Sequence, residues 1–438
     1  MTGLEVASRL AGPPTGAYIL QHLACPNEAL NRGSGTRKTH GRGTLPTPLW
    51  AAILPLGIAF GITYVLVPQV RRFAIECRVA DKPNGRKLHP HAIPHLGGVA
   101  IFSGFFLGLL VALAVPGGDA LAGRILALLP ALLILFGLGL VDDLRGLRAS
   151  VKLTYQLLGA VCVVAMGAGF PAAVPVDWAT FVALAAASLF WYVGVCNSIN
   201  LIDGLDGLAA GVVTLAALGF MAVAIRVHDA AVIVVALSIT GSLLAFLRFN
   251  FHPARIFMGD TGSMFLGFAL AALACLLARE VGFWTAVLGG AAMLGVPVMD
   301  TAAAICRRLA ARRHIFEADG EHTHHRLMRA GLTHRGAVVT LYAVQIVFVA
   351  LAMQVVAGHR AAFTGAVILG VVVAVVVSAL ARRAHVVVRP AAPALRPVLG
   401  RRDAVPVRSV APVRAAVRRD EAAAEVLAEL PPAAVRPS

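Results

Sequence analysis

NSINLIDGLDG, residues 197–207, is a polar stretch that lies between two long apolar runs of the chain. Asn200, Asp203 and Asp206 follow one another at three-residue steps, so a continuous helix would carry all three side chains on one side. The glycines within the stretch would let the backbone bend or end there. Two hypotheses follow. The stretch is a polar helix end at a membrane surface, or it is part of a functional site, since ionisable groups at membrane depth are usually functional.

The composition indicates a membrane protein. Of the 438 residues, 58% are hydrophobic and only 14% are charged, whereas soluble domains average about 25% charged residues. The mean hydropathy is +0.80. The formal net charge of +16 does not indicate nucleic-acid binding, because the basic residues lie in loops between apolar runs. We therefore expect an all-α, polytopic integral membrane protein embedded in the lipid bilayer.

Eleven runs of the sequence are apolar and long enough to span a bilayer, which takes about 20 residues. They are residues 49–70, 97–116, 122–141, 152–171, 177–197, 207–226, 229–247, 261–279, 282–302, 336–357 and 361–380. No repeat pattern organises them. The sequence thus predicts about eleven transmembrane helices.

The distribution of basic residues predicts the orientation of the chain. Alternate connecting segments and the C-terminal tail carry 29 of the 38 Lys and Arg residues, and the opposite side carries only Arg124, Arg226, Arg279 and Arg360. Cytoplasmic loops are enriched in Lys and Arg, so this rule places the C-terminus in the cytoplasm and the N-terminus outside. The N-terminal tail holds the remaining basic residues, and it is the one misfit to the rule.

Three regions are expected from composition. Residues 1–48 are polar and lack an apolar segment of signal-peptide type, so we expect a disordered extension. Residues 49–380 form the membrane domain, and residues 381–438 form a basic, disordered cytoplasmic tail. The six cysteines show no metal-binding spacing and lie mostly in or beside apolar runs, so no disulfide framework is expected.

Two polar clusters lie on the cytoplasmic side and precede residues 197–207 in the sequence. Arg86, Lys87 and His89 of DKPNGRKLH offer donors for phosphate oxygens, although an ordinary basic loop is the simpler alternative. Asp142 and Asp143 come just as the third helix leaves the membrane. Adjacent carboxylates repel unless a cation or a shared proton relieves them, so a Mg²⁺ site competes here with a solvated helix end.

Two more clusters follow on the same side. Asp260 lies in FMGDTGS, residues 257–263, near the start of the eighth helix, where a simple capping aspartate is the alternative. The long loop 303–335 carries four arginines and then the motif HTHHRL, which suits a diphosphate clamp. Zinc is a weaker interpretation, since no fourth ligand follows at a recognised spacing, and a polar loop with incidental histidines also remains open.

Together the clusters indicate a site for a metal-chelated, phosphorylated substrate at one membrane interface. A secondary transporter would instead place its acids near the bilayer midplane between internal repeats. An intramembrane aspartyl protease needs two aspartates and leaves the Arg and His residues unexplained. Both alternatives fit the sequence less well than a phosphate-handling enzyme.

Five motifs carry a resemblance to a known family: DKPNGRKLH with PHLGG, VDDLRGL, NSINLIDGLDGLAAG, FMGDTGS and HTHHRL. In this order and spacing they resemble the polyprenyl-phosphate N-acetylhexosamine-1-phosphate transferases, over residues 50–335. The HxHHRL form is similar to the GlcNAc-1-phosphate branch rather than the phospho-MurNAc-pentapeptide branch. One departure is Gly146, which occupies the last position of the family's DDxxD pattern, so a third acid is absent there.

The resemblance implies a reaction. GlcNAc-1-phosphate would pass from the UDP-sugar to undecaprenyl or another polyprenyl phosphate, with release of UMP and with Mg²⁺, or Mn²⁺ in its place, as cofactor. This would be the first membrane step of a cell-envelope polysaccharide, on the cytoplasmic face of the plasma membrane. The oligomeric state stays open, a homodimer included.

The resemblance also implies roles for individual residues. The catalytic residues would be Asp142, Asp143 and Asp260, and the metal ligands Asp260, Asp143 and Asn200. The substrate-binding residues would be Arg86, Lys87, His89, Asn197, Asn200, Asp203, Asp206, His322, His324, His325 and Arg326.

Overall fold

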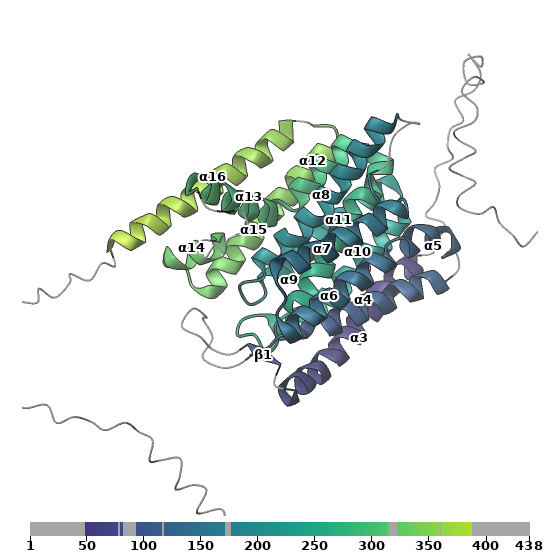
Figure 1. Cartoon of the computed structure of the whole chain (residues 1–438), viewed down its shortest axis with the longest axis horizontal. Coiled ribbons are helices and arrows are strands. Elements are labelled where there is room, and N and C mark those ends of the chain that lie inside the picture. Colours follow the sequence, from purple (N-terminus) through teal and green to yellow (C-terminus); the bar gives the residue numbers. More distant parts are fainter. Residues whose placement is uncertain are drawn as a thin grey trace, which may run out of the picture. The chain divides into compact units, whose positions relative to one another are not determined.

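The structure is a computed structural model, and it describes residues 49–77, 79–81, 93–115, 118–170, 177–312, 314, 322–359 and 361–387. In this part the chain is helical apart from one two-stranded ribbon (Figure 1). The helices are α3 (Leu49–Glu76), α4 (Gly97–Ala114), α5 (Asp119–Leu126), α6 (Leu129–Arg145), α7 (Ala149–Ala165), α8 (Trp178–Ile202), α9 (Leu208–Val227), α10 (Ala230–Asn250), α11 (Gly259–Val281), α12 (Phe283–Met293), α13 (Gly295–Ala310), α14 (Thr323–Arg329), α15 (His334–Val356) and α16 (Ala361–Val387). The antiparallel ribbon pairs β1 (Ala80–Asp81) with β2 (Ile93–Pro94).

The predicted all-α membrane architecture is confirmed, but the number of full spans differs from the sequence estimate. Within the described residues, nine spans are long and apolar enough to cross a bilayer. A tenth arises if α12 and α13, which meet at 85°, count as one broken span. At the one remaining expected run, residues 152–171, lies α7, an apolar helix of 17 residues, which is shorter than the usual spanning length.

Helix α11 is the centre of the bundle. Every residue from Thr261 to Ala278 is buried, and the helix packs against α4, α6, α8, α9, α10 and α12. A helix that is apolar all round and enclosed on every side has no solvent or lipid face. Its N-terminus, with Gly259 and Asp260, is therefore held in one place by the surrounding helices.

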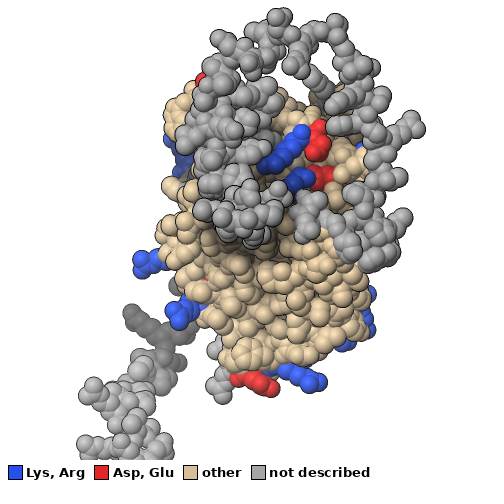
Figure 2. All heavy atoms as spheres, turned by 90° about the vertical axis from the view of Figure 1, so that its right-hand side faces the viewer, with Lys and Arg blue, Asp and Glu red and all other residues tan. Residues whose placement is uncertain are grey.

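The outer helices carry the surface that would face lipid. In Figure 1, α3 and α16 border the bundle on opposite sides, and the spanning windows of these helices are only 22% and 11% buried. The exposed residues on α16 include Val367, Val371 and Val375. Figure 2 shows red and blue side chains near the upper end of one face and at its lower edge, with a broad tan area between them. Such an apolar area suits contact with the hydrocarbon of a bilayer.

Polar contacts at the helix ends connect the bundle. Asp229 is the N-cap of α10, where its carboxylate accepts the Val232 N–H at 3.2 Å. The same carboxylate receives both terminal nitrogens of Arg124, from α5, at 2.8 Å. Arg124 also donates to the Leu276 carbonyl of α11 at 3.1 Å. These contacts fix three helices to one another at the end of the bundle that carries Arg124, which the charge pattern assigns to the outside.

The last helix is longer than expected. Helix α16 continues to Val387, beyond the boundary at residue 380 that composition suggested. The predictions for residues 1–48 and for the rest of the tail lie outside the described residues, apart from the helical residues 381–387. The five cysteines among the described residues are all free.

Candidate active site

The carboxylate of Asp260, on the second residue of α11, is the centre of the candidate site. Its Oδ1 accepts a hydrogen bond from Asn200 Nδ2 at 2.7 Å, and its Oδ2 lies 2.6 Å from Lys152 Nζ. Asn200 reaches it from the last turn of α8, and its amide also contacts Ser263 Oγ at 2.9 Å. The N-cap of α11 is Met258. The hypothesis that Asp260 is a simple capping aspartate is therefore wrong.

Lys152 places a positive charge between two carboxylates. Its ammonium forms ion pairs with Asp260 and with Asp142, whose other oxygen accepts the Leu147 N–H at 2.6 Å. The Asp142 side chain is almost fully buried, at 5% exposure, while Lys152 and Asp260 are 27% and 26% exposed. Sequence reasoning counted Lys152 only as a topological charge. The available signal was a lysine in the first turn of an otherwise apolar helix.

Asp143 holds the N-terminus of α11 from outside the helix. Its Oδ1 accepts the Asp260 N–H at 2.9 Å, and its Oδ2 accepts the Thr261 N–H at 2.9 Å and the Thr261 hydroxyl at 2.5 Å. The first N–H groups of a helix lack intrahelical partners and favour a negative charge. The two adjacent acids of VDDLRGL thus point to different partners: Asp142 to Lys152, and Asp143 to the helix end.

Three glycines allow this close approach of backbones. Gly98 of α4 and Gly139 of α6 lie against α11, where a Cβ would overlap the backbone of Gly262 or the carbonyl of Asp260. Gly259 has a φ of +70°, and a Cβ there would collide with the His95 carbonyl and with Asp143. The PHLGG and FMGD motifs also share backbone hydrogen bonds, from Gly97 N to Phe257 O at 2.9 Å and from Gly98 N to Met258 O at 2.8 Å. The motifs are adjacent in space because their glycines permit it.

Residues 197–207 do not form the continuous helix that their spacing predicted. Helix α8 ends at Ile202, and Gly207, at a φ of +79°, turns the chain into α9. Asn200 is therefore helical, whereas Asp203 and Asp206 lie in the loop between the two helices. The expectation that all three side chains share one face of a helix is wrong, because the glycines end the helix rather than only bend it.

Asp203 lies beyond the end of the α8 span and is partly buried. Burial, together with the negative charges of Asp260, Asp143 and Asp206, raises the pKa of Asp203 to about 7. Like charges nearby disfavour the ionised form of a carboxyl group. Asp203 is therefore an acid of this site whose charge changes near neutral pH.

Asp206 is buried and faces a different set of partners. Its Oδ2 accepts the Ala254 N–H at 3.0 Å and lies 2.8 Å from His252 Nδ1. The same loop is held by Asn250, whose amide oxygen accepts the Gly207 N–H at 3.0 Å, and by the Tyr342 hydroxyl, which donates to the Gly207 carbonyl. The loop is thus bound to the segment after α10 and to α15.

The histidine motif is anchored by Asp300, a buried residue of α13 that sequence reasoning did not single out. Its carboxylate lies 2.7 Å from His322 Nδ1, and it accepts the Thr323 N–H at 2.7 Å and the Thr323 hydroxyl at 2.6 Å. These contacts fix the first turn of α14. Asp300 sits inside a run expected to span the membrane, where an acid was itself a signal.

His324 connects the HTHHRL motif, residues 322–327, to residues 197–207. The residue is 2% exposed and packs against Gly204, where a Cβ would lie 2.5 Å from its Nε2. Burial, and after it the neighbouring His325, lowers the pKa of His324 to about 3. The imidazole is therefore neutral in the folded protein. Within the described residues, its Nε2 has no hydrogen-bond partner.

The remaining predicted residues are placed as follows. The Asn197 amide pairs with Gln156 of α7, donating to its side-chain oxygen at 2.8 Å, and makes no direct contact with the acidic cluster among the described hydrogen bonds. His325 is half-buried, and its ring lies tilted against that of His324, with centroids 4.3 Å apart. Arg326 donates to the Ser378 hydroxyl of α16. Arg86, Lys87 and His89 lie outside the described residues, between β1 and β2.

The fold and the site define a class. The chain is a multi-pass helical membrane protein whose motifs, far apart in sequence, meet at the N-terminus of the central helix α11. There two carboxylates enclose a cationic group, and glycines allow the backbones to touch.

Comparison with known proteins places the chain within that class. Residues 125–278 match the family profile described as Glycosyl transferase family 4. A Bacillus subtilis protein described as a probable undecaprenyl-phosphate N-acetylglucosaminyl 1-phosphate transferase is 38% identical over 296 residues, covering 65% of this chain and 79% of that protein. A Mycobacterium tuberculosis decaprenyl-phosphate N-acetylglucosaminephosphotransferase is 33% identical over 407 residues, covering 86% and 95%. A Desulforudis audaxviator phospho-N-acetylmuramoyl-pentapeptide-transferase is 34% identical over 334 residues, covering 69% and 97%.

The chain belongs to glycosyl transferase family 4. The resemblance inferred from the five motifs is thereby confirmed at the level of the family.

Proposed function

We propose that the protein transfers GlcNAc-1-phosphate from UDP-GlcNAc to a polyprenyl phosphate and releases UMP. An oxygen of the lipid phosphate attacks the phosphorus that bears the sugar, and the bond from that phosphorus to the bridging oxygen of UMP breaks. The relatives named for this reaction in Bacillus subtilis and Mycobacterium tuberculosis support the proposal. The single observation that carries it is the cluster of Asp142, Lys152, Asp260 and Asn200.

The cluster fits a divalent cation. Asp142 and Asp260 already enclose a positive group, the Lys152 ammonium, and the Asn200 side-chain nitrogen donates a hydrogen bond to Asp260. Mg²⁺ prefers oxygen ligands and usually binds one or two carboxylates plus substrate phosphates. Asp260, Asp142 and the Asn200 amide oxygen are our proposed ligands. Asp143 remains a further candidate, although both its oxygens already accept hydrogen bonds from α11. When bound, Mg²⁺ would neutralise diphosphate charge and favour departure of UMP.

The residues of the chain act by charge and position. A phosphate monoester must approach an anionic diphosphate, so neutralisation and in-line alignment are the main demands on the protein. We propose that Lys152 supplies positive charge at the reacting phosphates and that Arg326 and His325 meet the diphosphate or the sugar. Because the lipid phosphate is ionised near neutral pH, no strong base is required. Asp203 and Asp206 would line the nucleotide side.

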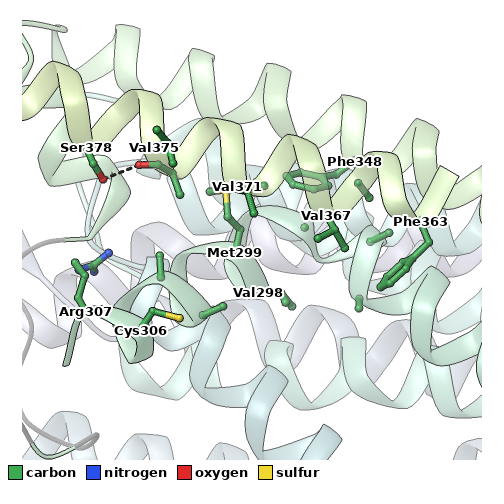
Figure 3. Close-up of a pocket in the computed structure, with 18 of the residues that line it drawn as sticks. Val298, Met299, Cys306, Arg307, Phe348, Phe363, Val367, Val371, Val375 and Ser378 are labelled. Carbon is green, nitrogen blue, oxygen red and sulfur yellow. Dashed lines mark hydrogen bonds between the residues drawn. The ribbon is translucent and has the colours of Figure 1, made fainter. Parts of the chain in front are cut away.

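An apolar crevice offers space for the lipid acceptor. It has a volume of about 600 Å³ and lies between α12, α13, α15 and α16. Figure 3 places Arg307 and Ser378 at one end and Phe363 at the other, with Met299 and Val371 between them. Arg326 also lines the crevice and donates to Ser378. A slot with hydrocarbon walls and guanidinium groups at one end matches the two parts of a prenyl phosphate.

The location of the reaction is proposed from charge. The polar motifs that meet at the N-terminus of α11 lie in the alternate connecting segments, which together with the C-terminal tail carry 29 of the 38 Lys and Arg residues. We propose that this end of the bundle faces the cytoplasm and that the membrane is the plasma (inner) membrane. UDP-sugars would then reach the site from the side on which they are made.

An exchange assay tests the function. Purified protein is mixed with polyprenyl phosphate and UDP-GlcNAc labelled in the sugar, with and without Mg²⁺. We expect label in the chloroform phase and an equal amount of UMP, both only with the cation. Absence of both products would exclude this donor and acceptor pair.

A second donor deserves the same assay, because relatives named phospho-N-acetylmuramoyl-pentapeptide-transferase also match at 30–36% identity. UDP-MurNAc-pentapeptide is offered in place of UDP-GlcNAc. If lipid product forms only from the pentapeptide donor, the peptidoglycan branch is correct and the GlcNAc assignment is wrong.

A further inference from the structure

Three metal-ligating side chains converge beside the candidate active site, and they belong to separate parts of the chain. Asp206 comes from the loop between α8 and α9, His252 from the segment after α10, and His334 from the first residue of α15. His252 Nδ1 lies 2.8 Å from Asp206 Oδ2, and His334 Nε2 lies 4.0 Å from the same oxygen. All three ligand atoms lie within 4.8 Å of one another.

The arrangement is close to that of a tetrahedral metal site. Bonds of about 2.0–2.1 Å from a zinc ion to its ligands place neighbouring ligand atoms roughly 3.3 Å apart. The observed separations from Asp206 Oδ2, 2.8 Å and 4.0 Å, lie on either side of that value. The two imidazole rings are nearly parallel, with centroids 4.2 Å apart. Side-chain shifts on the order of 1 Å would bring the three atoms around one ion.

The degree of burial also suits a bound ion. The Asp206 side chain is 1% exposed and that of His334 is 10% exposed, whereas His252 is 36% exposed. Two ligands are thus embedded and the third borders solvent, which leaves room for a water molecule as a fourth ligand. A site with three protein ligands and one open position is a common form of zinc site.

The ligand chemistry separates this cluster from the Mg²⁺ site proposed above. Two imidazoles and one carboxylate suit Zn²⁺ and other nitrogen-preferring divalent transition metals, whereas Mg²⁺ prefers oxygen. His252 would bind through Nδ1 with its proton on Nε2, and His334 through Nε2.

We propose that Asp206, His252 and His334 form a binding site for Zn²⁺ or a similar divalent transition metal. The bound ion links the loop after α8 to the start of α15. This loop already donates a hydrogen bond to Asn250 and accepts one from Tyr342, so the metal adds to an existing attachment rather than creating one. The bound metal would hold the segment that carries Asp203 and Asp206 in the position that the proposed reaction uses. Metal binding itself does not depend on the proposed transferase function.

Metal binding to the full chain in detergent tests the proposal. Protein is stripped with a chelator, equilibrated with Zn²⁺ and passed over a desalting column, and the zinc content per chain is then measured. The comparison uses wild type, His252→Gln, His334→Gln and, as a matched control, His359→Gln, since His359 is exposed after α15. We expect wild type and the control to retain one more zinc per chain than either ligand variant. The apparent dissociation constant should rise at least about tenfold in the ligand variants.

Two further readouts keep the test decisive if a variant folds poorly. Co²⁺ bound to wild type should show the strong visible absorption of a tetrahedral complex, and excess Mg²⁺ should not displace it. Zn²⁺ should raise the Tm of wild type but not that of the ligand variants, because only a ligand of the folded state stabilises it. Equal zinc content in all four proteins, or displacement of the metal by Mg²⁺, would overturn the proposal. A wild type without transferase activity that still binds zinc would leave the metal site standing and remove only the proposed function.

Discussion

At the scale of single residues, the site depends on where each carboxylate finds its partner. Asp142, Asp143 and Asp260 lie at the same end of the bundle, yet each has a different environment. Asp142 and Asp260 share Lys152, while Asp143 is occupied by the N-terminus of α11. Substitution of these acids should therefore give different phenotypes.

Asp260→Asn should remove activity and leave the fold intact. An amide keeps the size of the side chain and its contact with Asn200, but it loses the charge that holds Lys152 and a metal ion. We expect kcat to fall by about 10²–10³-fold in the exchange assay, the usual effect of losing one electrostatic group at a reacting phosphate. Asp177→Asn, at the exposed N-cap of α8, is the matched control and should keep wild-type activity. Wild-type turnover by the Asp260 variant would contradict the assignment.

Asp203 should make stability depend on pH. Because the pKa of Asp203 is raised to about 7 in the folded protein and is near 3.9 in an unfolded chain, the folded state holds the proton more tightly. Stability contributed by the neutral acid is present below about pH 4 and is lost as the pH rises toward 7. Asp203→Asn should therefore raise the Tm at pH 8 and change it little at pH 4. For a partly exposed group we expect about 1–2 kcal/mol after discounting for solvent. Equal effects at both pH values would show that the acid does not titrate as expected.

At the scale of helices and loops, contacts between segments decide the geometry. The N-terminus of α11 meets α4 and α6 at glycines, and α14 is fixed to α13 by one buried acid. No single sequence motif contains both partners of these contacts.

Gly139→Ala should disturb the site through packing alone. A Cβ at this position would overlap the Asp260 carbonyl, so α6 and α11 must separate. We expect a loss of about 1–3 kcal/mol in unfolding free energy, typical of overpacking, together with reduced activity. Gly137→Ala on the same helix is the control, because nothing lies within 4 Å of its Cβ position. That control should be neutral or stabilising, since alanine favours helix. Equal behaviour of the two variants would show that the close contact is not tight.

Asp300→Asn should loosen α14. The substitution removes the charge that pairs with His322 and weakens the contacts to Thr323, which normally contribute about 1–3 kcal/mol for a charged partner. Hydrogen exchange of residues 322–329 should become faster, while exchange in α11 stays unchanged. Protection of α14 at the wild-type level would mean that other contacts hold this helix.

The sequence alone was enough to identify the motifs and to predict that they meet at one end of the bundle. It was not enough to predict the side-chain partners that tertiary contacts bring together. Lys152 and Asp300 stand alone in apolar runs, so their partners Asp260 and His322, more than 20 positions away in sequence, could not be inferred. The single-helix arrangement of Asn200, Asp203 and Asp206 failed because periodicity cannot tell a glycine that bends a helix from one that ends it.

At the scale of the whole molecule, the charge pattern predicts a topology. In a chain without native cysteines, Ser150→Cys lies in the first turn of α7, and Asp177→Cys lies just before α8. Both positions are exposed. A membrane-impermeant maleimide should label Asp177→Cys in intact cells and Ser150→Cys only after the membrane is opened, as the positive-inside rule requires. The reverse pattern would place the candidate site outside the cytoplasm.

The crevice between α13 and α16 opens at the bundle's outer surface, where Val367, Val371 and Val375 are about half exposed. An acceptor that uses this opening arrives sideways, within the plane of the membrane, while the nucleotide arrives from water. The relevant quantity for the acceptor is then its two-dimensional density in the bilayer rather than its amount per litre. Diluting the same quantity of acceptor into more lipid would slow the reaction, although its bulk concentration stays constant. The reaction rate would thus depend on the surface density of the acceptor in the bilayer and on the volume concentration of the nucleotide sugar in water.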